Sequence, residues 1–594
     1  MDAEKTGNYQ ENIHRVDYRS AYENQLTGGD SLISGIFDGC ESLDGMWNFG
    51  IDQYDTCLRA KWFEEEYRDG DGRALPVDFS FDTWERVNVP SCWNLQREKD
   101  FHYEGSVVYT RTFAYKSRGE KRAFLKFEGV NYHAFVFING RQAGAHKGGS
   151  TPFFIEVTDF LREENRIVVV ADNTRRRESV PCENTDWFNY GGIFRSVSLI
   201  RMPETFIRRF SIALRPDGCF DKLDVLIGTD GSVNEGSAVL EIEELGIAAE
   251  IKIADGAGRI EIAARPELWS PENPKLYNVR VRYLGGELRE KVGFREIRTD
   301  GTEILLNGSP IFLRGVCTHE ESVENGRSLT EAEIRQNLSL AREMGCNFMR
   351  LAHYPHHELT ARIADEMGML LWEEIPVYWA IKFSSKETYL DAENQLFELI
   401  GRDINRASVI IWSVGNENAD TDERLSFMSA LAGKAKELDP ARLVSAACLV
   451  DHTQLVIADR LAEFVDVIGI NEYYGWYEPD FSKLPRIFEN SRPQKPVVIT
   501  EFGADARCGS RGSADDMYTE DFQRSVYERQ VAVLSEIKYV KGVCPWILYD
   551  FRCPRRLHCM QDGYNIKGLL SADKSRKKQA FSVMCDFYRS LSEK

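Results

Sequence analysis

After about residue 300 the sequence alternates short apolar runs with longer amphipathic stretches. The first run and stretch are IFLRGVCTH and TEAEIRQNLSLAREMG, and the alternation recurs as far as KGVCPWILYD and KKQAFSVMCDFYRSL. In the first stretch Ile334, Leu338 and Ala341 recur at helical spacing, so one helix face is apolar and the other carries Glu and Arg. Eight such units predict a (β/α)8 barrel over residues 299–594. The fifth and sixth helices, expected at VIADRLAEF and around KLPRIF, have the least regular pattern.

The chain before residue 300 has short β-type runs separated by turn residues and no helical pattern of useful length. RAFLKFEGV and NRIVVVADN are typical of a β-sandwich, which we expect over residues 1–203. KLDVLIGT and YNVRVRYL predict a smaller immunoglobulin-like sandwich over residues 204–298. A chain of 594 residues is too long for a single hydrophobic core, so this division into domains agrees with its length.

Charge and composition exclude several classes of partner. A formal net charge of −20 would repel phosphate backbones and anionic lipid, so we expect neither nucleic acid nor a membrane as a partner. The N-terminus, MDAEKTGNYQ, is polar, and no apolar run approaches the ~20 residues that a membrane-spanning helix needs. The 13 cysteines form no C-x-x-C pair, and we expect them to be free thiols. These features predict a cytoplasmic protein.

Two carboxylates stand where predicted barrel strands end. Glu417 follows the strand in VIIWSVGNEN and Glu501 ends the strand in VVITEFG, and barrel active sites lie at such ends. Either residue alone is explained equally well as a cap or an ion-pair partner. Together they fit glycoside hydrolysis, in which one carboxyl group protonates the leaving oxygen and another stabilises the sugar cation. Glu373 and Glu374 are a rival pair, but neighbours on a strand point to opposite sides, so we expect structural roles for both.

Other polar and aromatic side chains are expected around the same barrel mouth. They follow the remaining strands at His319, His353, Asn471, Tyr473, Tyr474, Trp546 and Asp550. The histidines of HYPHH and the residues Cys553, His558 and Cys559 lack the usual spacing of metal ligands, so no metal site is expected. The sequence contains no G-x-G-x-x-G, P-loop or G-x-S-x-G motif, which excludes motif-based readings as a nucleotide-binding protein or a serine hydrolase.

Several motifs resemble those of glycoside hydrolase family 2. They are SLDGMWNF, RGVCTHE, MRLAHYP, WSVGNEN, NEYYGWY and ITEFGAD, and the resemblance covers nearly the whole chain after about residue 40. It implies a jelly-roll domain of sugar-binding type, an immunoglobulin-like domain and a catalytic TIM barrel. It further implies that Glu417, preceded by Asn416, is the general acid/base, that Glu501 is the nucleophile, and that the reaction retains anomeric configuration. In DWFNYGGIFRSV it nominates Asp186, which would reach the active site from the first domain.

The stretch GYNIKG is similar to the N-x-K motif of the family's β-glucuronidases. By that resemblance Asn565 and Lys567 bind the substrate's carboxylate, since an amide and a cation make charge-assisted hydrogen bonds with it. The alternative is that Lys567 is a solvated loop lysine. Gln561 stands where such enzymes often carry Arg, which leaves the choice between glucuronate and galacturonate open, and Arg552, Arg555 or Arg556 could replace it. Strand ends and resemblance together give these substrate-binding candidates: Asp186, His319, His353, Asn416, Asn471, Tyr473, Tyr477, Trp546, Asn565 and Lys567.

The resemblance implies a retaining β-glucuronidase that acts on small or oligosaccharide β-glucuronides without metal or cofactor. A β-galacturonidase or dual hexuronidase is the alternative, and a neutral β-galactosidase or a non-catalytic carbohydrate-binding protein is less favoured. We expect a homo-oligomer. Some relatives bind a flavin nucleotide away from the active site, but no residue here points to one. The segment IPVYWAIKFSSKE after the third strand is short, which predicts a wide mouth.

Overall fold

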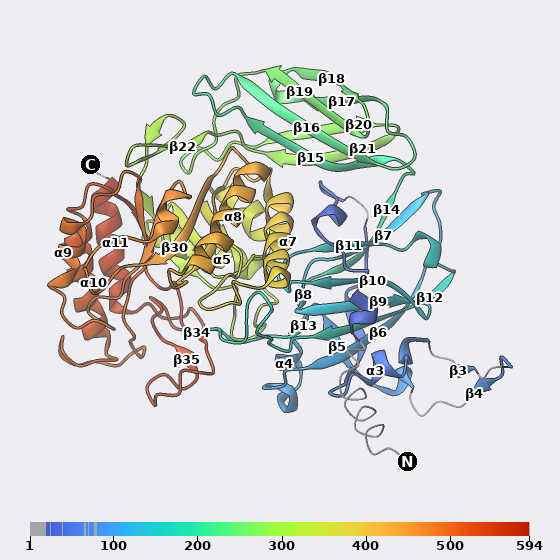
Figure 1. Ribbon diagram of the computed structural model, residues 1–594, viewed down its shortest axis with the longest axis horizontal. Coiled ribbons are helices and arrows are strands. Elements are labelled where there is room, and N and C mark those ends of the chain that lie inside the picture. The colour runs from blue at the N-terminus through green and yellow to red at the C-terminus, as the bar shows by residue number, and fades with distance from the viewer. Residues whose placement is uncertain are drawn as a thin grey trace, which may run out of the picture.

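The computed structural model describes residues 19–23, 25–37, 40–64, 67–68, 71–75 and 80–592. In Figure 1 a β-sandwich lies at the right, a second, smaller sandwich at the top and a barrel ringed by helices at the left. The predicted architecture is thereby confirmed. The N-terminal stretch that entered the prediction of location lies outside the described residues. Within the described ranges, no helix combines the length and apolar character needed to cross a bilayer.

The first domain packs two antiparallel sheets face to face. Their inner faces form one apolar core in which, for example, the rings of Phe127 and Phe153 stack at 4.9 Å. The four-stranded sheet has the order β1 (Glu41–Ser42), β14 (Val197–Met202), β7 (Arg122–Phe127) and β11 (Phe153–Glu156). The six-stranded sheet has the order β10 (Arg141–Lys147), β9 (His133–Ile138), β12 (Glu164–Asp172), β6 (Ser106–Ala114), β2 (Gly45–Ile51) and β5 (Glu85–Val89).

The second domain is a seven-stranded sandwich whose strands alternate buried and exposed residues, as in Tyr277–Tyr283. One sheet contains β15 (Phe206–Leu214), β16 (Lys222–Asp230) and β19 (Ala257–Ala263). The other contains β18 (Ile247–Ile253), β17 (Gly236–Ile242), β20 (Tyr277–Tyr283) and β21 (Gly286–Val292). The small sheet β22 (Ile297–Asp300), β23 (Glu303–Leu306) and β24 (Ser309–Pro310) leads into the barrel.

The barrel closes because its first strand is split into two parts. β25 (Leu313–Arg314) pairs with the last strand and β26 (Cys317–Thr318) pairs with the second. Gly315 lies between them, where a Cβ would come within 2.5 Å of the Cys544 sulfur. The parallel strands are β25 (Leu313–Arg314), β26 (Cys317–Thr318), β27 (Phe348–Leu351), β28 (Leu370–Glu374), β29 (Val409–Asn416), β30 (Leu443–Leu449), β31 (Ile468–Asn471), β32 (Val497–Glu501) and β33 (Val540–Val543). The helices around them are α5 (Glu331–Met344), α6 (Glu358–Met367), α7 (Lys386–Asp403), α8 (Asp422–Leu438), α9 (Lys483–Asn490), α10 (Glu520–Leu534) and α11 (Gln579–Ser592).

Local sequence signals explain where a typical barrel helix begins and ends. Helix α5 starts at a capping box, in which the Thr330 side chain and the Glu333 side chain bond each other's backbone N–H groups. It ends at Gly345, whose φ of 95° is readily adopted by glycine. Its predicted apolar face, which includes Ile334 and Leu338, is buried against the barrel.

Two details of the barrel differ from the sequence prediction. The expected fifth helix at VIADRLAEF is only a 3-10 turn over Arg460–Glu463, which begins at Asp459, whose side chain caps it and also accepts from Arg424 of α8. The loose sixth segment does form a helix, α9. Trp546 and Asp550 lie beyond the last strand, which ends at Val543.

Buried ion pairs fix the first domain against the barrel. Arg195 donates to both oxygens of Glu320 at 3.0 and 2.8 Å, and both side chains are about 1% exposed. Lys126 bonds Glu358 of α6 at 3.0 Å. In Figure 1 the hairpin of β34 (Phe551–Arg552) and β35 (Tyr564–Asn565) lies on the side of the barrel that faces the first domain. The Phe188 amide donates to the Arg552 carbonyl at 3.1 Å, which joins the segment 184–190 of the first domain to this hairpin.

Candidate active site

A cavity of about 410 Å³ opens at the C-terminal ends of the barrel strands. Its lining residues are Asp186, His353, Tyr378, Trp379, Glu417, Tyr473, Tyr477, Glu501, Trp546, Arg555, Arg556, Asn565 and Lys567. Most of the residues nominated from the sequence are therefore brought together here, including one from the first domain. Three of them, His319, Asn416 and Asn471, are not part of this lining. His319 contacts Tyr354, Asn416 accepts from Arg350, and Asn471 donates to Glu417.

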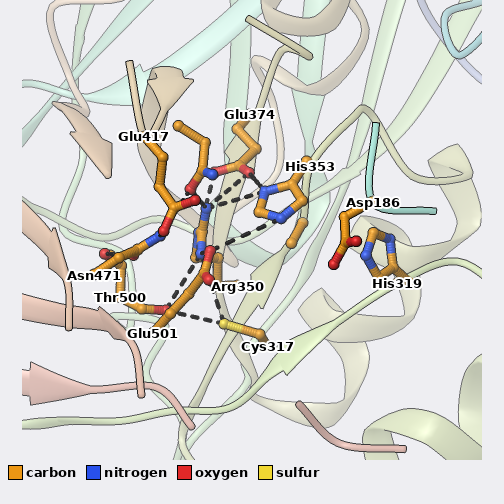
Figure 2. Close-up of polar contacts among 12 residues, drawn as sticks. Asp186, Cys317, His319, Arg350, His353, Glu374, Glu417, Asn471, Thr500 and Glu501 are labelled. Atoms are coloured by element: carbon orange, nitrogen blue, oxygen red, sulfur yellow. Dashed lines mark hydrogen bonds and ion pairs between the residues drawn. The ribbon is translucent and has the colours of Figure 1, made fainter. Parts of the chain in front are cut away.

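Glu501, the last residue of β32, is held by two donors. Arg350 Nη1 donates to Oε1 at 2.7 Å, and the Tyr473 hydroxyl donates to Oε2 at 2.6 Å. Arg350 is fully buried, and its guanidinium also donates to the Asn416 side-chain oxygen at 2.7 Å. The two donors fix the orientation of the Glu501 carboxylate, which lines the cavity. Figure 2 shows Arg350 beside Glu501.

Glu417 follows β29 in a left-handed backbone conformation, with a φ of 51°. Trp379 Nε1 donates to Oε2 at 2.7 Å, and Asn471 Nδ2 donates to Oε1 at 3.0 Å. Desolvation in the barrel mouth and the charge of nearby Glu501 raise the pKa of Glu417 to about 7. A carboxyl group with this pKa is protonated in part at neutral pH and can therefore donate a proton to a substrate.

Glu374 anchors the basic residues around Glu501. Arg350 donates to both of its oxygens at 3.0 and 3.1 Å, and His353 Nδ1 lies 2.8 Å from Oε1 (Figure 2). Burial alone would raise the pKa of Glu374, but the charge of Arg350 and the His353 contact outweigh burial and lower it to about 2. The adjacent Glu373 points to the other side of the strand, toward Arg402 of α7 at 3.8 Å. Neither residue of this rival pair lines the cavity.

Two polar atoms behind the cavity have no partner within the described part of the chain, Asn416 Nδ2 and His319 Nε2. The Asn416 oxygen is already occupied by Arg350, and His319 Nδ1 lies 3.1 Å from the Tyr354 hydroxyl. Burial, with the charges of neighbouring basic groups, lowers the pKa of His319 well below its usual value, so the ring is neutral.

Lys567 is buried rather than solvated, since the residue is only 1% exposed. Its Nζ bonds Asp505 Oδ1 at 2.5 Å and the Tyr477 hydroxyl at 3.2 Å. Asn565 lies beside it and donates to Asp186 Oδ2 at 3.2 Å. The alternative that Lys567 is a solvated loop lysine is therefore wrong. The N-x-K stretch instead places an ammonium group and an amide at one corner of the cavity.

The three arginines considered as substitutes for a missing Arg lie in different places. Arg556 contacts the Asp186 carboxylate and lines the cavity, as does Arg555. Arg552 points away from the cavity and donates to the Val323 carbonyl at 2.7 Å. Gln561, which stands at the position in question, donates to Asp505. Only Arg555 and Arg556 could therefore meet a substrate.

Sequence reasoning missed four residues of this site, one of which is Tyr378, a lining residue that lies between β28 and Trp379. Arg350 lies within a buried strand, where its charge in the apolar run NFMRLAHY was the available signal. Trp379 and Asp505 lie in segments that follow β28 and β32, and an aromatic or acidic residue shortly after a strand end was the signal there. Conversely, two proposed mouth residues face elsewhere. Tyr474 lies 2.9 Å from His452, and Asp550 pairs with Lys578 at 2.7 Å.

No cluster of three or more His, Cys, Asp and Glu side chains suited to a metal ion occurs among the residues that the structure describes. In the HYPHH stretch, His356 Nε2 lies 3.0 Å from the Ala352 carbonyl, and His357 Nδ1 accepts from the Leu359 amide at 3.1 Å. Both histidines thus have structural contacts of their own.

Comparison with known proteins gives the same family for all three domains. Residues 40–203 match "Glycosyl hydrolases family 2, sugar binding domain", residues 225–295 match "Glycosyl hydrolases family 2", and residues 297–589 match "Glycosyl hydrolases family 2, TIM barrel domain". A β-glucuronidase of Streptococcus agalactiae is 28% identical over 600 aligned residues, which cover 90% of this chain and 94% of that protein.

Two solved structures extend the likeness to three dimensions. A Ruminococcus gnavus β-glucuronidase in complex with a C6-substituted uronic isofagomine has a TM-score of 0.80 at 26% identity, covering 94% of this chain and 99% of that one. A β-galacturonidase of Eisenbergiella tayi bound to galacturonate has a TM-score of 0.80 at 27% identity, with the same coverage of 94% and 99%. The chain belongs to glycosyl hydrolases family 2.

Proposed function

We propose that the protein is a retaining β-glucuronidase that hydrolyses terminal β-D-glucuronides. The observation that carries the proposal is the presence, in one cavity, of two carboxyl groups with different surroundings and a buried ammonium group at its corner. The likeness to β-glucuronidases over nearly the whole chain supports it.

The two carboxyl groups have surroundings suited to the two roles of a double displacement. Glu501, oriented by Arg350 and Tyr473, attacks the anomeric carbon, while protonated Glu417 delivers its proton to the glycosidic oxygen as that bond breaks. Glu417, now a carboxylate, takes a proton from water, whose oxygen attacks the anomeric carbon; the bond from that carbon to the Glu501 oxygen breaks, which releases the sugar and restores both carboxyl groups. Side chains supply every step, so the proposal requires no cofactor.

The corner of the cavity that holds Lys567 suits a uronic acid. A C6 carboxylate that enters the cavity leaves water and needs charged donors, which Lys567 and the nearby Arg556 supply. The Asn565 amide adds a directed hydrogen-bond donor. A neutral C6 hydroxymethyl group would leave these buried donors poorly paired, so neutral galactosides should be weak substrates.

A β-galacturonidase is the second candidate. It is favoured by the likeness to the E. tayi protein and by Gln561, which occupies the position of the expected Arg and binds Asp505 instead of facing the cavity. The two uronic acids differ only at C4, and the same carboxylate corner would serve both.

Hydrolysis of three p-nitrophenyl glycosides, the β-D-glucuronide, β-D-galacturonide and β-D-galactoside, tests the proposal. We expect the highest kcat/KM for the glucuronide and the lowest for the galactoside. A higher value for the galacturonide would favour the second candidate. Comparable or greater activity on the galactoside would overturn both.

A further inference from the structure

Trp379 lies on the side of the cavity from which the leaving group departs. Its indole N–H donates to Glu417 at 2.7 Å, and in the proposed reaction Glu417 protonates the oxygen that leaves with the aglycone. The aglycone must therefore lie close to Glu417 and to the indole ring beside it. Trp379 lines the same cavity, so a side chain bound to the acid also contributes to its wall.

The backbone holds Trp379 firmly in this position. Its amide donates to the Asn416 carbonyl at 2.9 Å, and its own carbonyl accepts from Asn418 Nδ2 at 2.7 Å. Its ring stacks on Tyr378 at 4.5 Å. These two hydrogen bonds join the segment after β28 to the residues on both sides of Glu417. This part of the wall is preorganised rather than recruited by a substrate.

Arg555 covers the face of this tryptophan and carries a poorly compensated charge. Its guanidinium lies 4.9 Å from the Trp379 ring centre and donates to the neutral Asn184 side chain at 2.9 Å. Within the described ranges its one carboxylate partner is Asp186, at 3.8 Å, which Arg556 and Asn565 bind more closely. The other cations of the cavity have nearer carboxylates, as Lys567 has in Asp505.

A second hollow of about 530 Å³ adjoins the cavity and shares Arg555 with it. The first domain supplies most of its wall, including the aromatic residues Phe101, His102 and Phe188. The other arginine of this hollow, Arg175, pairs with Glu104 at 2.8 Å. Arg555 therefore remains the less compensated cation of the two, at the point where the hollow meets the leaving-group side.

We infer that Trp379, Arg555 and this hollow form a leaving-group subsite for an anionic carbohydrate. The inference rests on the proposed function. The aromatic residues in the wall of the hollow offer apolar contacts to a sugar ring, and a guanidinium pairs in bidentate fashion with a carboxylate or sulfate. The preferred substrate is then a β-glucuronide whose leaving group is a second sugar with a negative charge.

Three disaccharides in which β-D-glucuronate is linked to glucose, to a second glucuronate or to glucose 6-sulfate test the inference through glucuronate release. We expect a kcat/KM roughly threefold to thirtyfold higher for the charged acceptors, because an exposed charge-assisted contact is of that strength. The second and third disaccharides distinguish a carboxylate from a sulfate as the preferred group.

Arg555→Gln should bring the kcat/KM ratio of charged to neutral disaccharide close to one. Arg524→Gln is the matched control, since Arg524 lies on α10 with a side chain 46% exposed, against 45% for Arg555. The control should keep the wild-type ratio. A wild-type ratio near one, or a ratio unchanged by Arg555→Gln, would overturn the subsite. Absence of hydrolysis of every glucuronide would instead overturn the proposed function.

Discussion

Lys567 and Asp505 form an ion pair inside the barrel mouth, with Nζ 2.5 Å from Oδ1 and both side chains at most 2% exposed. Burial acts to lower the pKa of Lys567, but the Asp505 charge outweighs it, and the pKa is raised. The lysine therefore stays charged. An ammonium group has three donors, and Asp505 and Tyr477 occupy two of them, which leaves one for a substrate carboxylate.

Lys567→Ala should lower kcat/KM for p-nitrophenyl β-D-glucuronide by roughly thirtyfold to a few thousandfold. Removal of one partner of a buried charge-assisted contact costs about 2 to 5 kcal/mol. Residual hydrolysis of the β-D-galactoside should scarcely change, because a neutral C6 group does not use the ammonium. Steady-state kinetics on both substrates measure this ratio, and an unchanged ratio would show that the carboxylate is held elsewhere.

The same substitution leaves Asp505 as a buried charge without its lysine, so the protein should also become less stable. The double variant Lys567→Ala/Asp505→Asn removes that charge and should recover part of the thermal midpoint without recovering glucuronide hydrolysis. Thermal unfolding and kinetics on the same preparations separate the two effects. Recovery of activity together with stability would mean that Lys567 acts only through the fold.

The pH dependence of hydrolysis should follow the Glu417 carboxyl group. With a pKa of about 7, Glu417 loses its proton as pH rises, so kcat/KM for alkyl glucuronides, which need a proton on the leaving oxygen, should fall above pH ~7. Trp379→Phe removes an N–H that stabilises the carboxylate, so it should move this alkaline limb to higher pH. A limb that moves down, or stays in place, would contradict the role of Trp379.

From the raised pKa of Glu417 we also predict how the folding stability of the protein depends on pH. An unfolded Glu titrates near pH ~4.3, so the folded state binds the proton more tightly, and stability from this group declines between pH ~4.3 and about 7. Glu417→Gln removes the decline, and its stability relative to wild type should be up to about 3 kcal/mol more favourable at pH 8 than at pH 4. Thermal midpoints at the two pH values test this. An equal difference at both would show that Glu417 titrates alike in both states.

The sequence predicts the barrel because the alternation of apolar runs with amphipathic stretches does not depend on how individual side chains pack. It also locates Glu417 and Glu501, since both stand directly at strand ends. The role of Trp379 could not be predicted from the sequence, because the direction of its side chain depends on a loop conformation in which Trp379 has a φ of 53°. Arg350 was missed for a different reason. Its position in a strand is plain, but its pairing with Glu374 and Glu501 joins three strands, and such pairing follows only from the closed barrel.

Trapping of the glycosyl–enzyme tests the central claim most directly. Incubation with a 2-deoxy-2-fluoro-β-D-glucuronyl fluoride should add one fluoroglucuronyl group per chain. The fluorine at C2 slows both formation and hydrolysis of the glycosyl–enzyme, but the reactive fluoride leaving group speeds its formation, so the glycosyl–enzyme accumulates. Intact mass should show the addition, and peptide mapping should place it on Glu501, with no label in Glu501→Gln and little from the corresponding galactosyl fluoride. Label on another residue, or equal labelling by the galactosyl reagent, would contradict a uronate-selective double displacement through Glu501.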